Sequence, residues 1–352
     1  IGHRRAQGQP AFPPPIFAGI SSCPNLVHLM PQVLILTEIQ ESIRARYKAM
    51  LLGRFPQLTI NVVGHHSQVD PYIAETEILL CFSPPMADHV VRDAPKLKWI
   101  QALGTGVDNI VDLPSLGKEV LVTNVRGIHG APVSEATIAY MLALARDLPQ
   151  AVRAQEKREW TRWPAHLLHG KTVGILGVGL IAETLAPMCK AFGMTVIGIS
   201  SAPRAAAGFD RMVHRDELIK VVGELDYLVA LAPLTEATRG IIGGKVLNAM
   251  KSTAYIVNVA RGGVVDEPAL IEALNAGRIA GAALDVFSQE PLPPENPIWK
   301  ARNVHIYSHL GGYSEGYEER AMPTIAGNMA CYLAGEPQKM INIVRRPASW
   351  GR

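Results

Sequence analysis

The chain contains, at residues 171–182, the stretch Lys171-Thr-Val-Gly-Ile-Leu-Gly177-Val-Gly179-Leu-Ile-Ala182. An apolar run ends there in the pattern G-x-G-x-x-A, which is typical of a strand that turns tightly into a helix beneath a dinucleotide pyrophosphate. Gly177 permits the turn, Gly179 lets the backbone approach the phosphates, and Ala182 lets the helix pack closely on the strand. The N-terminus of that helix would offer unpaired N–H groups to the anion. By itself the pattern also fits an ordinary glycine-rich turn.

The motif stands within a succession of alternating strands and helices. The strand candidates are Val33–Leu36, Leu58–Val63, Ile78–Phe82, Leu97–Leu103, Leu121–Val125, Thr172–Leu176, Thr195–Ile199, Tyr227–Leu231, Ala254–Val259, Gly281–Phe287 and Val304–Tyr307. Helical spacing occurs at Ile39–Leu52, Ser134–Leu148, Glu267–Ala276 and Met322–Leu333. We expect Pro149 to end the second of these helices and the sequence Gly335-Glu-Pro to end the last. Such alternation predicts an α/β protein whose parallel sheets carry helices on both faces.

The bulk properties limit the class of protein. A chain of 352 residues suits about two domains of ~150 residues, and 48% hydrophobic with 18% charged residues is typical of globular proteins with sizeable cores. A net charge of +3 argues against nucleic-acid or membrane partners. The four cysteines are far apart and lack C-x-x-C spacing, which argues against a metal site or a disulfide framework and predicts a reducing compartment, the cytoplasm: Cys23, Cys81, Cys189 and Cys331.

Residues 1–29 differ from the rest of the chain, because four prolines crowd a segment without periodicity: Pro10, Pro13, Pro14 and Pro15. These prolines interrupt any apolar core that a targeting peptide would need. We therefore expect a disordered extension, with Met30 as the natural start.

Chemically capable side chains follow the strands of the second half. Arg261 comes shortly after Ala254–Val259, Asp285 lies in Gly281–Phe287 with Glu290 three residues beyond its end, and His309 follows Val304–Tyr307. Ligands bind outside the carboxyl ends of the strands in doubly wound sheets. A cation, two carboxylates and a histidine are therefore expected at one sheet edge, a set that suits hydride transfer to a 2-keto acid.

Several motifs together resemble the D-isomer-specific 2-hydroxyacid dehydrogenase family, and its glyoxylate and hydroxypyruvate reductases in particular. They are Gly104-Thr-Gly106-Val-Asp108-Asn, Gly170-Lys-Thr before the glycine motif, Pro233-Leu-Thr235, Asn258-Val-Ala-Arg261-Gly-Gly-Val-Val-Asp266-Glu, Leu284-Asp285-Val-Phe-Ser-Gln-Glu290-Pro-Leu-Pro and His309-Leu-Gly-Gly. Glu290 and His309 lie 29 and 48 positions after Arg261, as in the family. The resemblance covers roughly Met30 to Val344.

The resemblance implies two doubly wound parallel-sheet domains. A Rossmann dinucleotide-binding domain, residues 128–309, is inserted into a flavodoxin-like substrate domain made of residues 30–127 and 310–346. The cleft between them is expected to hold the site, and the resemblance also implies a homodimer and no metal.

Three catalytic roles follow from the resemblance. Arg261 anchors the substrate carboxylate and carbonyl through its planar fork. His309 exchanges a proton with the carbonyl oxygen, for which an imidazole is suited near neutral pH, and Glu290 orients His309 and favours its protonated form. The alternatives are a solvated turn arginine, a solvated glutamate in a proline-rich loop, and a capping or core histidine, since Ser308 replaces the usual proline before His309.

The other expected contacts form two sets. The cofactor set is Gly177, Val178, Gly179, Leu180, Ile181, Ser200, Ser201, Arg204, Ala232, Pro233, Thr238, Val259, Ala260, Arg261, Asp285, His309 and Gly311. The substrate set is Leu103, Gly104, Thr105, Gly106, Arg261 and His309. Asp285 is expected to contact the nicotinamide amide, with a strand-end cap as the alternative, and the Gly104–Gly106 loop could also be a plain turn. Surface or packing roles are expected for His129, His166, His169 and His305; Tyr313 and Tyr317 could face the cleft or pack the interdomain helix.

The residues after the second strand of the Rossmann unit bear on the choice of cofactor. NAD-binding folds place an acid about 20 residues beyond the glycines. Here Ser200, Ser201 and Arg204 occupy that region, and the first acid is Asp210. This pattern favours NADP(H) over NAD(H), with an ordinary loop cation as the alternative role of Arg204.

The expected activity is reduction of a small 2-keto acid, such as glyoxylate or hydroxypyruvate, to the D-2-hydroxy acid. Phosphite dehydrogenases need a lysine near Gly104, which is absent, and formate dehydrogenases carry glutamine where Glu290 stands. Phosphoglycerate dehydrogenases often have an added regulatory domain. A cofactor-sensing corepressor of the same family remains the alternative from a different class, although Arg261, Glu290 and His309 are all present.

Overall fold

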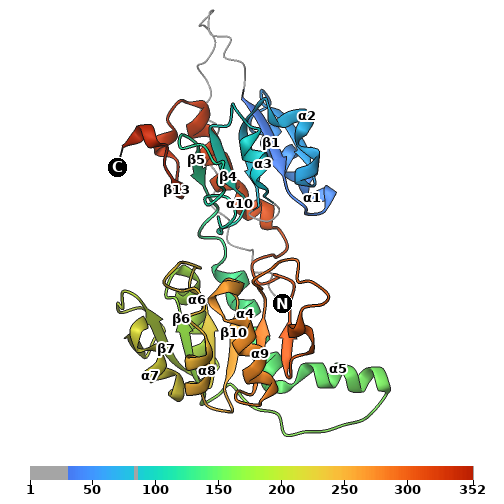
Figure 1. The fold of residues 1–352 in the computed structure, drawn as a ribbon, viewed down its shortest axis with the longest axis vertical. Helices are drawn as coiled ribbons and strands as arrows, with labels where there is room; N and C mark the ends of the chain where they lie inside the picture. Colours follow the sequence, from blue (N-terminus) through green and yellow to red (C-terminus); the bar gives the residue numbers. More distant parts are fainter. Residues whose placement is uncertain (1–30, 83–85, 352) are drawn as a thin grey trace, which may run out of the picture.

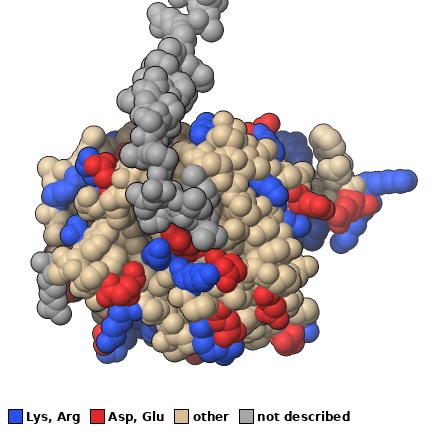
Figure 2. Space-filling model, turned by 90° about the horizontal axis from the view of Figure 1, so that it is seen from above, with Lys and Arg blue, Asp and Glu red and all other residues tan. Residues whose placement is uncertain are grey.

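The computed structural model describes residues 31–82 and 86–351 and divides their strands between two sheets, which lie at opposite ends of the long axis of the molecule (Figure 1). The predicted extension at residues 1–29 lies outside the described residues. Among the helices of the described part, none is both long and apolar enough to span a membrane. On the face shown in Figure 2, positive and negative side chains are interspersed rather than segregated.

The first sheet has six strands in the order β13-β5-β4-β3-β1-β2. Their bounds are β1 Gln32–Leu36, β2 Thr59–Val63, β3 Thr76–Cys81, β4 Trp99–Ala102, β5 Leu121–Thr123 and β13 Ile343–Arg345. The order β2-β1-β3-β4-β5 is the flavodoxin-like one, and all of these pairs are parallel. Only the edge strand β13 is antiparallel, to β5.

The second sheet has seven parallel strands in the order β12-β11-β10-β9-β6-β7-β8. Their bounds are β6 Thr172–Leu176, β7 Thr195–Ser200, β8 Arg211–His214, β9 Tyr227–Ala230, β10 Tyr255–Asn258, β11 Gly281–Leu284 and β12 Val304–Ile306. This is the Rossmann order with one further strand. The strand order reverses between β6 and β9, so the glycine motif after β6 lies at the point where such sheets bind ligands.

Ten α-helices occur in the described ranges, 31–82 and 86–351. Their bounds are α1 Glu41–Leu52, α2 Asp70–Ile73, α3 Asp88–Arg92, α4 Gly130–Arg146, α5 Leu148–Lys157, α6 Leu180–Ala191, α7 Leu218–Val221, α8 Gly244–Ala249, α9 Glu267–Asn275 and α10 Tyr317–Leu333. Single turns of 3₁₀ helix occur at η1 His66–Gln68, η2 Arg215–Glu217, η3 Val222–Glu224, η4 Gly262–Val264, η5 Pro297–Lys300, η6 Pro337–Lys339 and η7 Ala348–Trp350.

Each sheet is buried on both faces, as its uninterrupted apolar strands require. In the second sheet Val229 and Val257 belong to the core under α4 and α6, whereas their neighbours Leu228 and Ile256 belong to the core under α7, α8 and α9. In the first sheet the same alternation divides one core shared with α1 and α10 from another shared with α2 and α3. The predicted α/β class with two doubly wound sheets is confirmed.

Some predicted boundaries are wrong. Helix α4 ends before Pro149, because Asp147 adopts a left-handed conformation (φ 49°) and its side chain accepts a hydrogen bond from the Gln150 N–H at 3.3 Å. Pro149 therefore belongs to the first turn of α5, where proline is tolerated. Strand β11 ends at Leu284, so Asp285 follows the strand instead of lying inside it. The short edge strands β8 and β13 have no counterpart among the predicted strands.

Two chain segments link the sheets. One leads from β5 to α4, which packs on the second sheet, and the other leads from β12 to α10, which packs on the first. The division into residues 30–127 with 310–346 and residues 128–309 stays a prediction in its exact limits.

Candidate active site

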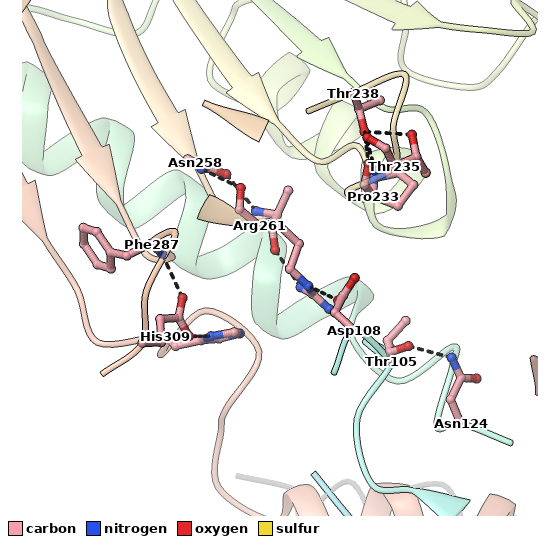
Figure 3. Close-up of polar contacts among 12 residues, drawn as sticks. Thr105, Asp108, Asn124, Pro233, Thr235, Thr238, Asn258, Arg261, Phe287 and His309 are labelled. Atoms are coloured by element: carbon pink, nitrogen blue, oxygen red, sulfur yellow. Dashed lines mark hydrogen bonds and ion pairs between the residues drawn. The ribbon is translucent and has the colours of Figure 1, made fainter. Parts of the chain in front are cut away.

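The chemically capable side chains of the second half meet at one edge of the second sheet. Gly177 follows β6, Arg261 follows β10, Asp285 follows β11, and His309 follows β12. Parallel strands end at the same edge, so this grouping follows directly from the topology. Across from it, the loop after β4 brings Asp108 into contact with Arg261 (Figure 3).

Arg261 reaches from the second sheet to the loop that follows β4. Its Nε donates to Asp108 Oδ2 at 2.7 Å, and its Nη1 donates to the Ala260 carbonyl at 2.6 Å. A Cβ at Gly106 would collide with Nη2, so a side chain there would displace the guanidinium from this position. The side chain is 32% exposed and its plane is held in place. The predicted anchor thus lies beside the predicted carboxylate-binding loop.

The turn that carries Arg261 explains the residues around it. Asn258 Oδ1 accepts from the Ala260 N–H at 3.1 Å, and its Nδ2 donates to the Arg261 carbonyl at 3.0 Å. A side chain at Gly262 would collide with the Phe287 carbonyl group. The asparagine and glycine of this motif therefore set the direction in which Arg261 projects.

His309 and Glu290 form a close pair. Glu290 Oε2 lies 2.7 Å from His309 Nδ1, and Oε1 accepts from the Phe287 N–H at 2.8 Å. Burial raises the pKa of Glu290, but the hydrogen bonds from His309 and Phe287 and the charges of His309 and Arg261 together lower it below its ordinary value. Glu290 is therefore ionised near neutral pH, and Nε2 is the ring nitrogen of His309 that can serve a substrate.

Asp285 fixes the backbone that carries His309. Its main-chain oxygen accepts from the His309 N–H at 2.8 Å, and its carboxylate accepts from the N–H groups of Leu310 and Gly311 at 2.8 and 2.9 Å. Tyr140 of α4 donates to the same carboxylate at 2.8 Å. These bonds support the left-handed conformation of His309 (φ 54°), which histidine adopts more readily than most residues. The predicted nicotinamide contact stays a prediction; the capping role is present in the structure.

The glycine motif has the shape that a dinucleotide requires. Gly177 has φ 102°, and a Cβ there would collide with the Ala232 backbone. A Cβ at Gly179 would meet no atom of the described residues within 4 Å, so among these residues space lies open at the N-terminus of α6. Within the part of the chain that the structure describes, no side chain caps that helix, which leaves its first N–H groups to an anion. These residues fit a pyrophosphate.

The residues predicted to choose the cofactor lie at the end of β7. Ser200 is half-buried and Ser201 exposed, and the Arg204 guanidinium is ion-paired with Glu183 of α6 instead of standing alone. Asp210 is held at the other end of β7 by Lys190 and by the Val196 N–H. Asp210 is thus remote from the Ser200–Arg204 region. The sequence pattern does not reveal the role of Glu183, because that residue lies on a different element.

Thr238 and Pro233 form part of an internal turn. The Thr238 hydroxyl donates to the Pro233 carbonyl at 2.6 Å and accepts from the Thr235 N–H at 2.8 Å (Figure 3). Its side chain is buried. A cofactor contact by Thr238 stays a prediction, and the observed bonds shape the loop that faces Gly177.

The loop after β4 is tied to the end of β5. The Val125 N–H donates to the Gly104 carbonyl at 3.0 Å, the Thr105 hydroxyl donates to the Val125 carbonyl at 2.8 Å, and Asn124 Nδ2 donates to the Thr105 carbonyl at 2.6 Å. These bonds to Asn124 and Val125 therefore fix the backbone of the Leu103–Gly106 loop before a substrate binds.

Sequence reasoning missed three residues of this region. Asp108 orients Arg261, although the sequence marks it only as one position of the Gly104–Asn109 motif. Tyr140 lies 145 positions before the carboxylate it binds. His129, for which a surface or packing role is expected, also has two polar partners, because its ring nitrogens lie 2.9 Å from Thr105 Oγ1 and 3.0 Å from the Tyr317 hydroxyl. A spacing argument along the sequence could not have found such distant partners. His166 and His169 are exposed, and His305 is half-buried.

Comparison with known proteins agrees with this geometry. The family model described as "D-isomer specific 2-hydroxyacid dehydrogenase, NAD binding domain" matches residues 138–311. The glyoxylate reductase of Korarchaeum cryptofilum is 35% identical over 265 residues, which are 73% of this chain and 80% of that protein. The chain belongs to the D-isomer-specific 2-hydroxyacid dehydrogenase family. The predicted family, and with it the predicted class of NAD(P)-dependent oxidoreductase, is confirmed.

Two further relatives of this dehydrogenase are informative. The D-3-phosphoglycerate dehydrogenase of Methanocaldococcus jannaschii is 38% identical over 261 residues. The present chain spans about half of that relative's length, 49%. The NADPH-dependent glyoxylate/hydroxypyruvate reductase of Sinorhizobium meliloti, solved with NADP and sulfate, superposes with a TM-score of 0.75 at 27% identity. The superposition covers 90% of the present chain and 98% of the Sinorhizobium chain. In the described part of the dehydrogenase, no cluster of three or more His, Cys, Asp or Glu side chains could hold a metal ion.

Proposed function

We propose that this dehydrogenase reduces small 2-keto acids, such as glyoxylate or hydroxypyruvate, to the D-2-hydroxy acids, with NADPH as the preferred donor. The observation that carries the proposal is the His309–Glu290 pair, 2.7 Å apart, at the same sheet edge as Arg261 and opposite the Gly104–Gly106 loop. Relatives named glyoxylate reductase support the substrate class.

Arg261 and the loop after β4 would hold the substrate. Asp108 and the Ala260 carbonyl occupy Nε and Nη1, so Nη2, beside Gly106, is the nitrogen turned toward the loop. A carboxylate placed there gains charge-assisted hydrogen bonds from the guanidinium and from backbone N–H groups. The keto group is thereby directed toward His309.

His309 would supply the proton for the reaction. A bound nicotinamide cofactor supplies a hydride to the carbonyl carbon. As the carbon–oxygen π pair moves onto oxygen, the imidazolium of His309 gives its Nε2 proton to that oxygen, and the ring is left neutral. Glu290 stays ionised, holds the Nδ1 proton and stabilises the imidazolium before the transfer. In the oxidation direction the neutral ring removes the hydroxyl proton.

The cofactor preference would rest on the end of β7. Ser200 and Ser201 offer hydroxyls to a 2′-phosphate, and Arg204 offers a guanidinium once its bond to Glu183 is exchanged for one to the phosphate. Binding of NADP by the Sinorhizobium reductase supports the same choice.

The test is a steady-state assay of nicotinamide absorbance with purified protein. Glyoxylate and hydroxypyruvate are each supplied with NADPH or NADH, and D-3-phosphoglycerate is supplied with NAD. We expect turnover of the two keto acids with NADPH. Turnover of D-3-phosphoglycerate alone would favour the activity named for the Methanocaldococcus relative, and no turnover of any substrate, with tight cofactor binding, would favour a sensing role.

We further propose that two copies associate through the segment around α5. This helix has no buried residue, it projects from the body of the molecule (Figure 1), and apolar side chains on and beside it are exposed: Leu148 48%, Val152 55%, Trp160 93% and Leu167 58%. A second copy of the same chain would cover this apolar surface.

We also propose that the protein resides in the cytoplasm, which the free thiols of Cys81, Cys189 and Cys331 support.

Light scattering after size-exclusion chromatography tests the association. We expect the mass of a dimer, and of a monomer for the Val152→Glu, Trp160→Glu double variant. The control is Ile219→Glu, which places the same charge at an exposed apolar side chain of α7. A dimer that survives the double variant, or a monomeric unmodified protein, would contradict this assignment.

A further inference from the structure

His129 lies where both segments that link the two sheets come together. It directly precedes α4, the first helix after the crossing from β5. Its Nε2 contacts Tyr317, the first residue of α10 after the return crossing. A Cβ on Gly312, three residues after His309, would lie 3.2 Å from His129 Cδ2. The ring is thus packed against the return crossing as well.

The two hydroxyls bound by His129 both reach the loop after β4. Thr105 Oγ1 lies 2.9 Å from Nδ1 and 2.8 Å from the Val125 carbonyl. The Tyr317 hydroxyl lies 3.0 Å from Nε2 and 3.0 Å from the Leu103 carbonyl. Leu103 and Thr105 flank Gly104, so the imidazole and its two partners bracket the part of the loop expected to hold the substrate carboxylate.

The number of protons in this network is limited. Burial, and then the positive charges of Arg261 and Arg320, lower the pKa of His129 to about 4, so the ring is neutral near neutral pH. A neutral imidazole has one N–H and one lone pair. If both hydroxyls donated to the backbone carbonyls, both ring nitrogens would have to donate. One hydroxyl must therefore donate to the ring, and the imidazole connects the two hydroxyls as donor on one side and acceptor on the other.

We propose that His129 is a positioning residue, which holds the Gly104–Gly106 loop against both interdomain crossings in the geometry that binds the keto-acid carboxylate. This inference rests on the proposed function. Its consequence is that losing either hydrogen bond of the ring weakens binding of the keto acid while cofactor binding is unchanged, since the glycine motif lies on a different loop.

Two conservative variants separate the two bonds. Asn places an amide near the position of Nδ1, so His129→Asn keeps a partner for Thr105 and loses Tyr317. Gln reaches the position of Nε2, so His129→Gln keeps Tyr317 and loses Thr105. We expect each to raise KM for glyoxylate by about tenfold, the factor that corresponds to ~1.4 kcal/mol for one lost hydrogen bond. The control is His169→Asn, at an exposed histidine of the cofactor half.

Combination with Tyr317→Phe gives a readout that a merely structural defect would not produce. His129→Asn already lacks the tyrosine contact, so adding Tyr317→Phe removes only the contact with the Leu103 carbonyl and should raise KM less than it does in His129→Gln. In His129→Gln, which keeps that contact, Tyr317→Phe should raise KM again. NADPH dissociation constants are measured for every variant and should match the unmodified enzyme, and melting temperatures identify any variant that is unfolded at the assay temperature.

The outcomes separate this inference from the proposed function. If the unmodified protein reduces no 2-keto acid, the proposed function is wrong and this inference is withdrawn with it. If the unmodified protein is active but His129→Asn and His129→Gln keep its KM, or if Tyr317→Phe acts equally on both, the positioning role is overturned and the proposed function stands. If an unstable variant obscures KM, Tyr317→Phe alone should still raise it, and an unchanged value would also overturn the role.

Discussion

At the scale of single residues, replacement of His309 is expected to have the largest effect on turnover. Asn keeps a hydrogen-bond partner for Glu290 but offers no exchangeable acid of suitable pKa. His309→Asn should therefore lower kcat of keto-acid reduction by ~10²–10⁴, the usual effect of a positioned general acid, with NADPH binding retained. Stopped-flow turnover and fluorescence titration of NADPH measure the two quantities. A near-normal kcat would remove His309 from the mechanism.

Arg261 should affect binding and chemistry together. Lysine keeps the charge, but it cannot bind Asp108 and a carboxylate at once through a planar fork. Arg261→Lys should raise KM and lower kcat for glyoxylate in the same variant. Unchanged values of both constants would show that the carboxylate is anchored elsewhere.

Arg204 and Glu183 bear on the choice of cofactor. We expect kcat/KM to be higher with NADPH than with NADH by at least about tenfold, or ~1.4 kcal/mol. Arg204→Ala should remove much of this preference without harming NADH use, and Ser200→Asp should reverse it by repelling the phosphate and accepting from ribose hydroxyls.

The ion pair adds a matched variant to that series. Glu183→Gln releases Arg204 from a competing carboxylate, so it should strengthen the preference for NADPH. Equal efficiency of the unmodified enzyme with the two cofactors would refute the assignment, whatever the variants do.

At the scale of elements, His129 joins α4 to α10 and should make stability depend on pH. Its folded-state pKa of about 4 lies below the ordinary 6.5, so between these values the unfolded chain binds the extra proton. Stability therefore rises with pH across this window and is lost as pH falls through it, by at most about 3 kcal/mol. Urea unfolding at about pH 5 and about pH 7 should show a smaller difference for His129→Asn than for the unmodified protein. The same difference in both would show that other groups cause the acid sensitivity.

The elements that could be predicted from the sequence are those made of apolar residues that become buried. The strand before Gly177 and the strand before Arg261 are apolar runs buried on both faces, and each ends in a glycine or turn motif. Strands β8 and β13 are short and only partly buried at sheet edges, so neither alternation nor an apolar run marks them. Helix α5 was missed because Pro149 reads as a helix stop, whereas a left-handed Asp147 makes it a helix start.

In the candidate site too, some residues could be predicted from the sequence and others could not. Arg261, Glu290 and His309 could be found because each follows a strand end in a recognisable motif. Asp108, Tyr140, His129 and Glu183 could not, since each acts on a partner supplied by a different element, up to 188 positions away for His129 and Tyr317. Their roles exist only once the two sheets are assembled.

At the scale of the whole molecule, the Arg261–Asp108 pair spans the two halves. Each half alone holds only part of the chemistry: the second sheet supplies Arg261, Glu290 and His309, and the first supplies the Gly104–Gly106 loop. The proposed reduction therefore requires residues of both halves.

The most direct measurement of the central claim is the product formed from hydroxypyruvate and NADPH by the unmodified enzyme. The product is resolved on a chiral column and compared with the NADPH consumed. We predict one D-glycerate for each NADPH oxidised. L-glycerate as the product, or no glycerate from an enzyme that binds NADPH, would contradict the account.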